Sequence, residues 1–166
     1  MTIDDLNNQS KQDAAYALLQ CCTSARWVEK MLACRPFFNF RAVHEAADQC
    51  WLRLDEADYL QAFEGHPKIG DVNSLRAKYA NTKALASGEQ SAVSEASDEV
   101  LTQLSEGNEA YFNQFGFIFI VCATGKSAGE MLALLQARLP NSRDIELKKA
   151  AEEQRKIFHI RLEKLL

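Results

Sequence analysis

The sequence predicts an all-α protein, a compact single-domain bundle of about seven to nine helices that spans residues 1–166. Three observations predict this class. Apolar residues recur every three or four positions along most of the chain, and residues that cap helix starts precede several of these stretches. Only one short segment has the composition of a β-strand, and a single strand has no partner with which to form a sheet.

The first three expected helices follow one another closely. An Ala- and Leu-rich helix covers residues 13–22. Ser24 can cap a second helix, whose apolar residues fall on one face and which ends at Pro36. A third helix covers residues 40–54 with the same apolar spacing.

Two shorter helices are expected in the middle of the chain. Asp55 can cap one that carries Phe63 toward a loop at His66. Asn73 or Ser74 opens the other.

The second half begins with the clearest start signal. Ser87-Gly88-Glu89-Gln90 reads as a capping box, and a long helix is expected from there to Phe115, with a bend near Gly107 as one alternative. The β-like segment, residues 117–123, follows and is interpreted as a buried extended or short helical stretch. Ser127 caps a helix that Pro140 stops, and Ser142 caps a final helix that runs almost to the end.

Composition and charge exclude several classes of protein. Apolar residues make up 47% of the chain and charged residues 25%, as in an ordinary globular protein. The net charge of −4, with no basic run, disfavours nucleic acid or an anionic membrane as a partner. The longest nearly unbroken apolar run, residues 115–123, is too short to span a bilayer.

The cysteines and the N-terminus predict a cytoplasmic protein. The five cysteines are odd in number, contain no Cys-x-x-Cys pair and are expected to be reduced thiols. The N-terminus is acidic and has no apolar core of a secretory signal. A zinc site is not expected, because His44, His66 and His159 have no ligand-like spacing with one another or with cysteine.

His66 is the first candidate for chemistry. It lies in Gly65-His66-Pro67-Lys68-Ile69-Gly70, where Pro67 disfavours the helical conformation of His66 and the glycines allow bends on both sides. Histidine exchanges protons most easily near neutral pH, so a stiff loop here could present an acid, a base or a hydrogen-bond donor. The alternative is a turn that happens to contain histidine.

Other candidates each have a structural alternative. Glu89 and Gln90 could serve only the helix dipole and the capping box, or could lie beside an anion-binding helix start. Arg161 lies close to the apolar face of the last helix, either as a snorkelling side chain or as a planar clamp for a carboxylate or amide. Residues 115–123 are either simple core or a source of free backbone groups for a polar heterocycle.

These features, in this order, resemble one family, the 2-oxo-4-hydroxy-4-carboxy-5-ureidoimidazoline (OHCU) decarboxylases of urate breakdown. The resemblance is carried by Phe63 to Gly70, Ser87 to Gln90, Phe115 to Ala123 and Arg161-Leu162. No single motif is decisive, but the ordered set is specific. The chain length and the absence of a peroxisomal tail resemble the bacterial branch.

The resemblance implies an all-helical, homodimeric and cytoplasmic enzyme that converts OHCU to (S)-allantoin and carbon dioxide with no cofactor and no metal. It implies catalytic roles for His66 and Glu89. It implies that the remaining matched positions bind substrate: Pro67, Ser87, Gln90, Phe119, Ile120, Val121, Cys122, Ala123 and Arg161. Two other functions stay open from the residues themselves, a non-enzymatic helical interaction module and an acid–base hydrolase of a related ureide.

Overall fold

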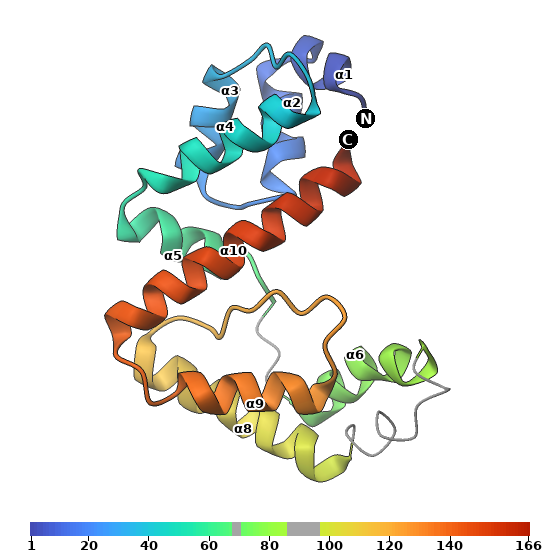
Figure 1. Ribbon diagram of the computed structural model, residues 1–166, viewed down its shortest axis with the longest axis vertical. Coiled ribbons are helices and arrows are strands. Elements are labelled where there is room, and N and C mark those ends of the chain that lie inside the picture. The colour runs from blue at the N-terminus through green and yellow to red at the C-terminus, as the bar shows by residue number, and fades with distance from the viewer. Residues whose placement is uncertain (68–70, 86–96) are drawn as a thin grey trace. The chain divides into compact units, whose positions relative to one another are not determined.

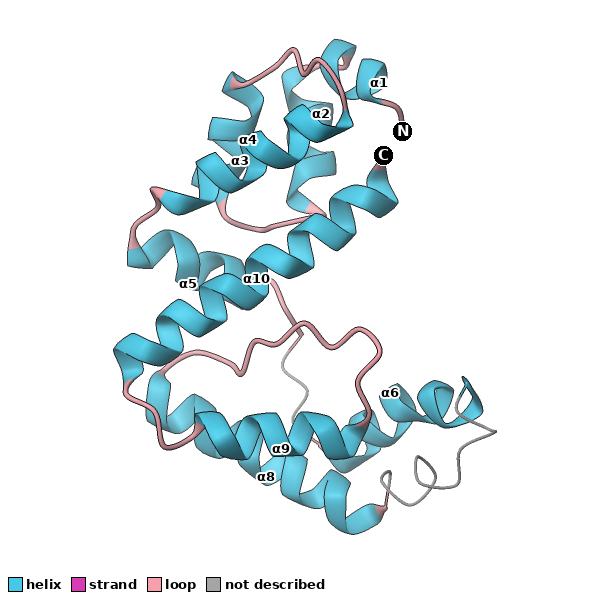
Figure 2. Cartoon of the chain, viewed as in Figure 1, coloured by secondary structure: helices cyan, strands magenta, loops and turns pink. Residues whose placement is uncertain are grey.

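The structure is a computed structural model that describes residues 1–67, 71–85 and 97–166 (Figure 1). Every regular element in these ranges is a helix, and none of the residues they contain forms a strand (Figure 2). The predicted all-α class is therefore confirmed. The nine helices described in these ranges agree with the expected seven to nine.

Contacts divide the chain into two compact units. The terminal unit consists of Met1–His66 and Ala150–Leu166, and the central unit consists of Pro67–Lys149. The prediction that residues 1–166 act as a single domain stays a prediction.

Six helices contribute to the terminal unit, and most begin where the sequence predicts. The Ser24 hydroxyl accepts a hydrogen bond from the Trp27 N–H at 3.3 Å, and Asp55 is the N-cap of the helix that leads to His66. The helices are α1 (Ile3–Asn8), α2 (Lys11–Leu19), α3 (Ala25–Ala33), α4 (Phe40–Leu52), α5 (Glu56–Glu64) and the later part of α10 (Arg143–Leu165).

The first two helices of the terminal unit differ from the sequence prediction. Helix α1 was not expected, yet Thr2 and Asp5 form a reciprocal capping box at its start. The Ala- and Leu-rich helix, α2, begins at Lys11 after its cap, Ser10, and ends at Leu19 instead of Cys22. Local capping hydrogen bonds therefore set both starts more strongly than the apolar spacing does.

An aromatic cluster on α3, α4 and α10 forms the centre of the terminal core. Trp27 is fully buried, and its ring centroid lies 5.1 Å from that of Phe158. The Trp27 indole N–H donates to the Ala47 carbonyl oxygen at 3.1 Å, and the Trp51 indole N–H donates to the Ala151 carbonyl oxygen at 3.0 Å. These contacts fix the later part of α10, which carries Gln154 and Arg161, against α4.

The central unit contains α6 (Val72–Leu85), α8 (Asp98–Phe115), α9 (Ala128–Arg138) and the start of α10. The long helix was expected to begin at Ser87, but α8 begins at Asp98. The Ser97 hydroxyl accepts from the Val100 N–H at 3.3 Å, and two acidic residues in the first turn complement the helix dipole. The predicted capping box at Ser87–Gln90 lies outside the described residues.

Helices α8 and α9 lie side by side, and a glycine allows their close approach (Figure 1). A Cβ atom added to Gly107 would lie 2.5 Å from Cδ2 of Leu135, which is fully buried on α9. The absence of a side chain at Gly107 therefore brings the two helices together. The segment between them, residues 117–123, is drawn as a loop in Figure 2.

Residues 117–123 form neither a helix nor a strand. Gly116 ends α8 in the left-handed conformation, with φ of 80°, and so releases the chain into this segment. Phe117 and Ile120 are buried, whereas their neighbours up to Ala123 are half-buried. The expectation that this segment joins no sheet is confirmed for the described residues, its short-helix alternative is wrong, and the predicted burial holds only for Phe117 and Ile120.

Candidate functional site

The loop that carries His66 is held by a close contact at Gly65. The Gly65 backbone is right-handed helical, with φ of −70°. A Cβ atom there would lie 2.1 Å from Oγ1 of Thr23, whose hydroxyl donates to the Gln61 carbonyl oxygen at 3.1 Å. Gly65 is thus required for space and not, as the sequence suggested, for a bend.

The His66 imidazole is half-buried and bonded on one nitrogen. Its Nε2 lies within hydrogen-bond distance of Oε1 of Gln154, a fully buried residue on α10. A carbonyl oxygen can only accept, so Nε2 carries the hydrogen and a neutral ring keeps its lone pair on Nδ1. Burial lowers the pKa of His66, the Gln154 hydrogen bond raises it, and the charge of Arg161 lowers it further.

Arg161 lies on the same face of α10 as Gln154, about two helical turns further along. It is half-buried, and its Nη1 donates to the Cys21 carbonyl oxygen at 3.4 Å. Its charge acts on the His66 ring. The terminal unit therefore brings together a neutral imidazole and a planar guanidinium. The imidazole can exchange a proton with a ligand, and the guanidinium can bind an anionic or carbonyl oxygen.

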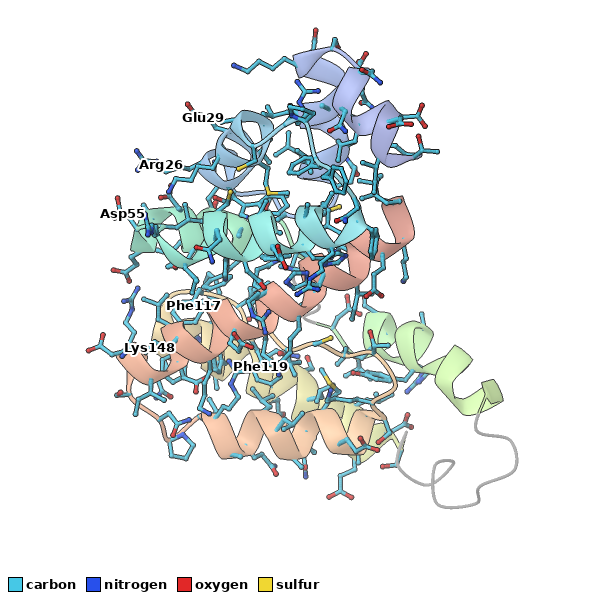
Figure 3. All side chains as sticks on the ribbon, turned by 45° about the horizontal axis from the view of Figure 1, so that its top comes forward. Arg26, Glu29, Asp55, Phe117, Phe119 and Lys148 are labelled. Carbon is cyan, nitrogen blue, oxygen red and sulfur yellow. The ribbon has the colours of Figure 1, made fainter. Side chains whose placement is uncertain are left out.

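The candidate substrate segment of the central unit is held by a buried arginine. Nη1 of Arg138 donates to the Ile120 carbonyl oxygen at 2.6 Å. The Arg138 guanidinium carbon lies 4.7 Å from the ring centroid of Phe119, a side chain labelled in Figure 3. One side chain thus fixes both the backbone and a side chain of the segment.

Arg138 is itself held by a buried carboxylate. Its Nε donates to Oε1 of Glu146 at 2.7 Å, and the Tyr111 hydroxyl donates to the same oxygen at 2.6 Å. Asn141 donates to the second carboxylate oxygen at 2.9 Å. Burial, together with the hydrogen bond to Glu146, raises the pKa of Tyr111. Such a network holds its members in one geometry because each loses a partner if another moves.

The predicted site residues fall into three groups. His66 and Arg161 lie together in the terminal unit. Pro67, which is exposed, and Phe119 to Ala123 belong to the central unit, where the Cys122 carbonyl oxygen accepts from Nζ of Lys126 at 2.7 Å. Ser87, Glu89 and Gln90 lie outside the described residues, so their predicted roles stay predictions.

Searches for two other kinds of site gave negative results within the described ranges. No group of three or more His, Cys, Asp or Glu side chains there could hold a metal ion. No helix in those ranges is both long and apolar enough to cross a membrane.

Comparison with known proteins identifies the family. The family model of OHCU decarboxylase matches residues 7–163. The chain belongs to the OHCU decarboxylase family. The family assigned from the ordered motifs is therefore confirmed.

Three relatives illustrate the match. The chain is 35% identical to the uric acid degradation bifunctional protein TTL of Arabidopsis thaliana, over 87% of this chain and 45% of that protein. It is 25% identical to the 2-oxo-4-hydroxy-4-carboxy-5-ureidoimidazoline decarboxylase of Halalkalicoccus jeotgali, over 99% and 92% of the two chains. A crystal structure of OHCU decarboxylase in the presence of (S)-allantoin matches with a TM-score of 0.71 at 30% identity, over 95% of this chain and 98% of the other.

The chain spans less than half the length of the bifunctional relatives that it matches. It spans nearly all of the decarboxylase from Halalkalicoccus jeotgali and of the allantoin-bound crystal structure. The region shared with the bifunctional proteins is therefore the part that belongs to the OHCU decarboxylase family.

The sequence analysis did not single out three polar residues, Gln154, Arg138 and Glu146. All three are buried, and a buried amide or charged group is unusual and needs a partner. The signal available in the sequence was a polar or charged residue on the apolar side of a predicted helix.

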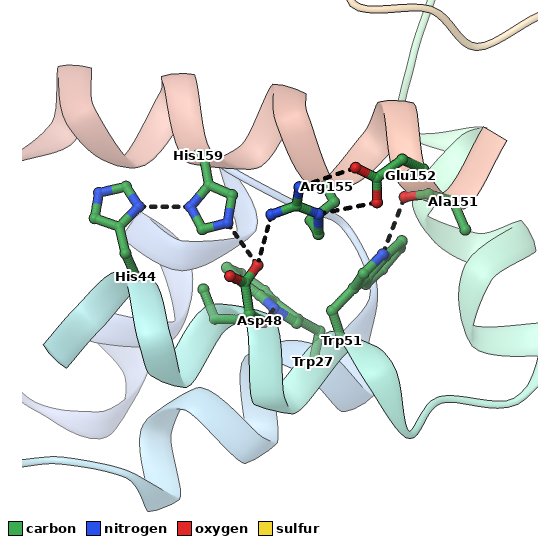
Figure 4. Close-up of polar contacts among 9 residues, drawn as sticks. Trp27, His44, Asp48, Trp51, Ala151, Glu152, Arg155 and His159 are labelled. Atoms are coloured by element: carbon green, nitrogen blue, oxygen red, sulfur yellow. Dashed lines mark hydrogen bonds and ion pairs between the residues drawn. The ribbon is translucent and has the colours of Figure 1, made fainter. Parts of the chain in front are cut away.

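A second polar cluster in the terminal unit joins α4 to α10 (Figure 4). His159 Nε2 lies 2.6 Å from Oδ1 of Asp48, and its Nδ1 faces Nδ1 of His44 at 2.5 Å. Since Asp48 accepts from Nε2, a neutral His159 accepts from His44 through Nδ1. Nε2 of His44 is buried and has no hydrogen-bond partner within the described part of the chain, so a second proton on that ring is poorly accommodated.

This cluster predicts a loss of stability on mild acidification. Burial, and then the neighbouring His159, lower the pKa of His44, and burial also lowers that of His66. The unfolded chain, with histidine pKa values of about 6.5, then binds more protons, so stability rises with pH through this window and falls below it. The melting temperature should drop between pH 7 and pH 5.5. His44→Gln should flatten this slope, and an unchanged slope would contradict the assignment.

Proposed function

We propose that this chain catalyses the decarboxylation of OHCU to (S)-allantoin in urate breakdown, with its own side chains and without a cofactor. Membership of the OHCU decarboxylase family supports the proposal. The observation that carries it is the cluster of His66 and Arg161. Both residues match motif positions of the family, both belong to the terminal unit, and the charge of Arg161 acts on the His66 ring.

The substrate can supply its own electron sink. When the bond between the ring carbon and the carboxyl group breaks, its electron pair forms a C=C bond to the neighbouring ring carbon and carbon dioxide leaves. The π pair of the adjacent C=N bond moves to the ring nitrogen, which takes up a proton from solvent. The enol-like intermediate then loses its hydroxyl proton and gains a proton on the neighbouring carbon, which becomes the stereocentre. The protein has to orient the carboxylate, accept one proton and deliver another to one face.

The proposed roles follow from these needs. His66 is neutral because burial lowers its pKa, so it can accept the hydroxyl proton. Arg161 offers a planar fork to an anionic or carbonyl oxygen of the substrate. Glu89 delivers the proton that sets the stereocentre, while Gln90 and the backbone of residues 119–123 bind the ureido and ring amides. Pro67 and Ser87 shape the substrate site.

The test is product analysis with freshly made substrate. Urate is oxidised and hydrolysed enzymatically, the protein is added, and carbon dioxide release is followed together with the optical activity of allantoin. We expect (S)-allantoin and stoichiometric carbon dioxide, unchanged by dialysis against a chelator. Ureide cleavage without decarboxylation would indicate the hydrolase, and no acceleration of either reaction would indicate an interaction module.

We further propose that residues 1–166 work as one domain of a cytoplasmic homodimer. This rests on the resemblance, and the match of the family model to residues 7–163 supports it for the domain. Light scattering in line with gel filtration measures the mass of the assembly. A mass of a single 18.7 kDa chain at working concentrations would refute the dimer.

Arg161→Lys should weaken substrate handling while the fold persists. Lysine keeps the charge but loses the planar fork, which two-point recognition of an oxygen pair requires. We expect kcat/KM to fall by about tenfold or more, the scale of one charge-assisted hydrogen bond. Circular dichroism checks the fold, and wild-type kinetics would show that the guanidinium makes no contact with substrate.

Glu89→Gln should change the stereochemistry of the product as well as the rate. The amide keeps the shape of the side chain but cannot deliver an exchangeable acid proton. Solvent can then protonate either face of the intermediate. Circular dichroism of the product should show partly racemic allantoin, and pure (S)-allantoin formed at the wild-type rate would rule out the proposed role of Glu89.

A further inference from the structure

Gln154 occupies a position that an apolar residue would fill at lower cost. Its side chain is fully buried on α10, about one helical turn before the buried Phe158. Its Nε2 is buried and has no hydrogen-bond partner among the residues that the structure describes. A buried amide with one end unpaired is less favourable than a satisfied one, because the unpaired group has lost its hydrogen bonds to water. The glutamine does make one contact that an apolar residue could not make, because its amide oxygen bonds to His66.

We propose that Gln154 is a positioning residue for His66: it holds the ring in the tautomer that carries hydrogen on Nε2, so that Nδ1 is the nitrogen that exchanges a proton with the substrate. The role assigned to Nδ1 rests on the proposed function. The tautomer itself does not, because it follows from an oxygen that can only accept.

The location of the two residues supports this role. His66 follows α5, and the contact between Gly65 and Thr23 restricts the loop. Gln154 is on α10, which the indole of Trp51 binds through the Ala151 carbonyl oxygen at 3.0 Å. Both partners are thus placed by packed elements of one unit, so the ring is oriented before a substrate arrives.

An amide suits this position better than a carboxylate would. A carboxylate would pair with the imidazolium and keep the ring protonated, as an opposite charge does. The amide oxygen accepts from Nε2 in both charge states of the ring, without a full negative charge. Among the described residues, the charged group that acts on the ring is Arg161, whose charge favours the neutral form. The ring therefore rests neutral and can still accept a proton on Nδ1.

The first experiment reads the tautomer directly and needs no substrate. The chain has three histidines, so the 15N spectrum of the imidazoles is sparse, and His66→Asn identifies the His66 signals. In the resting protein above the His66 pKa, Nε2 should be protonated and Nδ1 should not. Gln154→Met should give a mixture of tautomers. Hydrogen on Nδ1 in the wild type, or an unchanged tautomer in the variant, would overturn the proposal.

The second experiment measures kcat/KM as a function of pH. Two variants should shift the acidic limb of this profile, where activity falls as His66 is protonated, in opposite directions. Gln154→Glu should move that limb to higher pH, because the introduced carboxylate stabilises the imidazolium. Gln154→Met should move it to lower pH, because the hydrogen bond that raises the pKa is lost. We expect Gln154→Met to lower kcat by about 10- to 100-fold, as loss of an orienting partner does, with little change in KM.

Controls separate positioning from stability. Gln136→Glu makes the same chemical change at an exposed position of α9 and should leave the pH profile unchanged. Shifts of the two Gln154 variants in the same direction, or no shift in either, would overturn the proposal. If Gln154→Met does not fold, the wild-type spectrum and Gln154→Glu, which keeps the shape of glutamine, still decide it.

The two experiments distinguish this proposal from the proposed function. A protein that does not form allantoin but shows an Nε2-protonated His66 dependent on Gln154 would refute the function and keep the tautomer assignment. A protein that forms (S)-allantoin with an Nδ1-protonated His66 would keep the function and refute the role of Gln154.

Discussion

Replacing His66 with asparagine is expected to slow allantoin formation by about two to four powers of ten, the usual span for a lost general acid or base. Asparagine cannot accept a proton at neutral pH, and its short amide takes the place of Nδ1, not of the Nε2 that bonds to Gln154. The fold should persist, because His66 lies after the end of α5, is only half-buried and contributes little to the core. Single-turnover measurements of carbon dioxide release give the rate, and circular dichroism checks the fold.

A matched histidine variant controls for nonspecific effects. His44→Asn changes another half-buried histidine of the terminal unit and should keep nearly the wild-type rate. In the wild type, activity should persist below the usual histidine pKa of about 6.5, because burial lowers the pKa of His66. Equal rates for His66→Asn and the wild type would show that the imidazole takes no part in the reaction.

Local signals in the sequence predicted most helices, because caps act over three or four residues. Ser24, Asp55 and Ser127 each begin the helix expected of them. The same reasoning placed the start of α8 at Ser87, whereas the helix begins after Ser97. Both serines are good caps, so local chemistry alone could not choose between them. Helix α1 has only six residues, too few to show an apolar period.

The candidate residues of the site could be chosen from the sequence, but their contacts could not be predicted from it. His66 stood out because a proline and two glycines surround it, and Arg161 because it lies on an apolar stripe. The partner of His66, Gln154, is 88 positions away in the chain, and nothing local relates the two. The same holds for Arg138, whose bond to the Ile120 carbonyl oxygen depends on how α9 packs. Contacts of this kind arise from tertiary packing.

The largest expected loss of stability comes from the buried carboxylate of the central unit. Glu146→Leu would leave the Arg138 guanidinium, 7% exposed, without its carboxylate. Removal of one partner of a buried ion pair destabilises a protein by about 3–5 kcal/mol, because the remaining charge stays out of water. The change would also take away the acceptor of the Tyr111 hydroxyl. Urea titration followed by circular dichroism measures the free energy of unfolding.

Two further variants show whether the loss comes from the unpaired charge. The ion pair between Arg41 and Glu45 is exposed, so Glu45→Leu should change stability by less than about 1 kcal/mol. The double variant Arg138→Leu with Glu146→Leu should lose less than the sum of the single variants, since neither charge is then left alone. It would still free the Ile120 carbonyl oxygen from its donor. If the double variant regains stability while its kcat/KM stays low, the ion pair serves to position residues 119–123. If instead the losses in the free energy of unfolding simply add, the two charges do not stabilise each other.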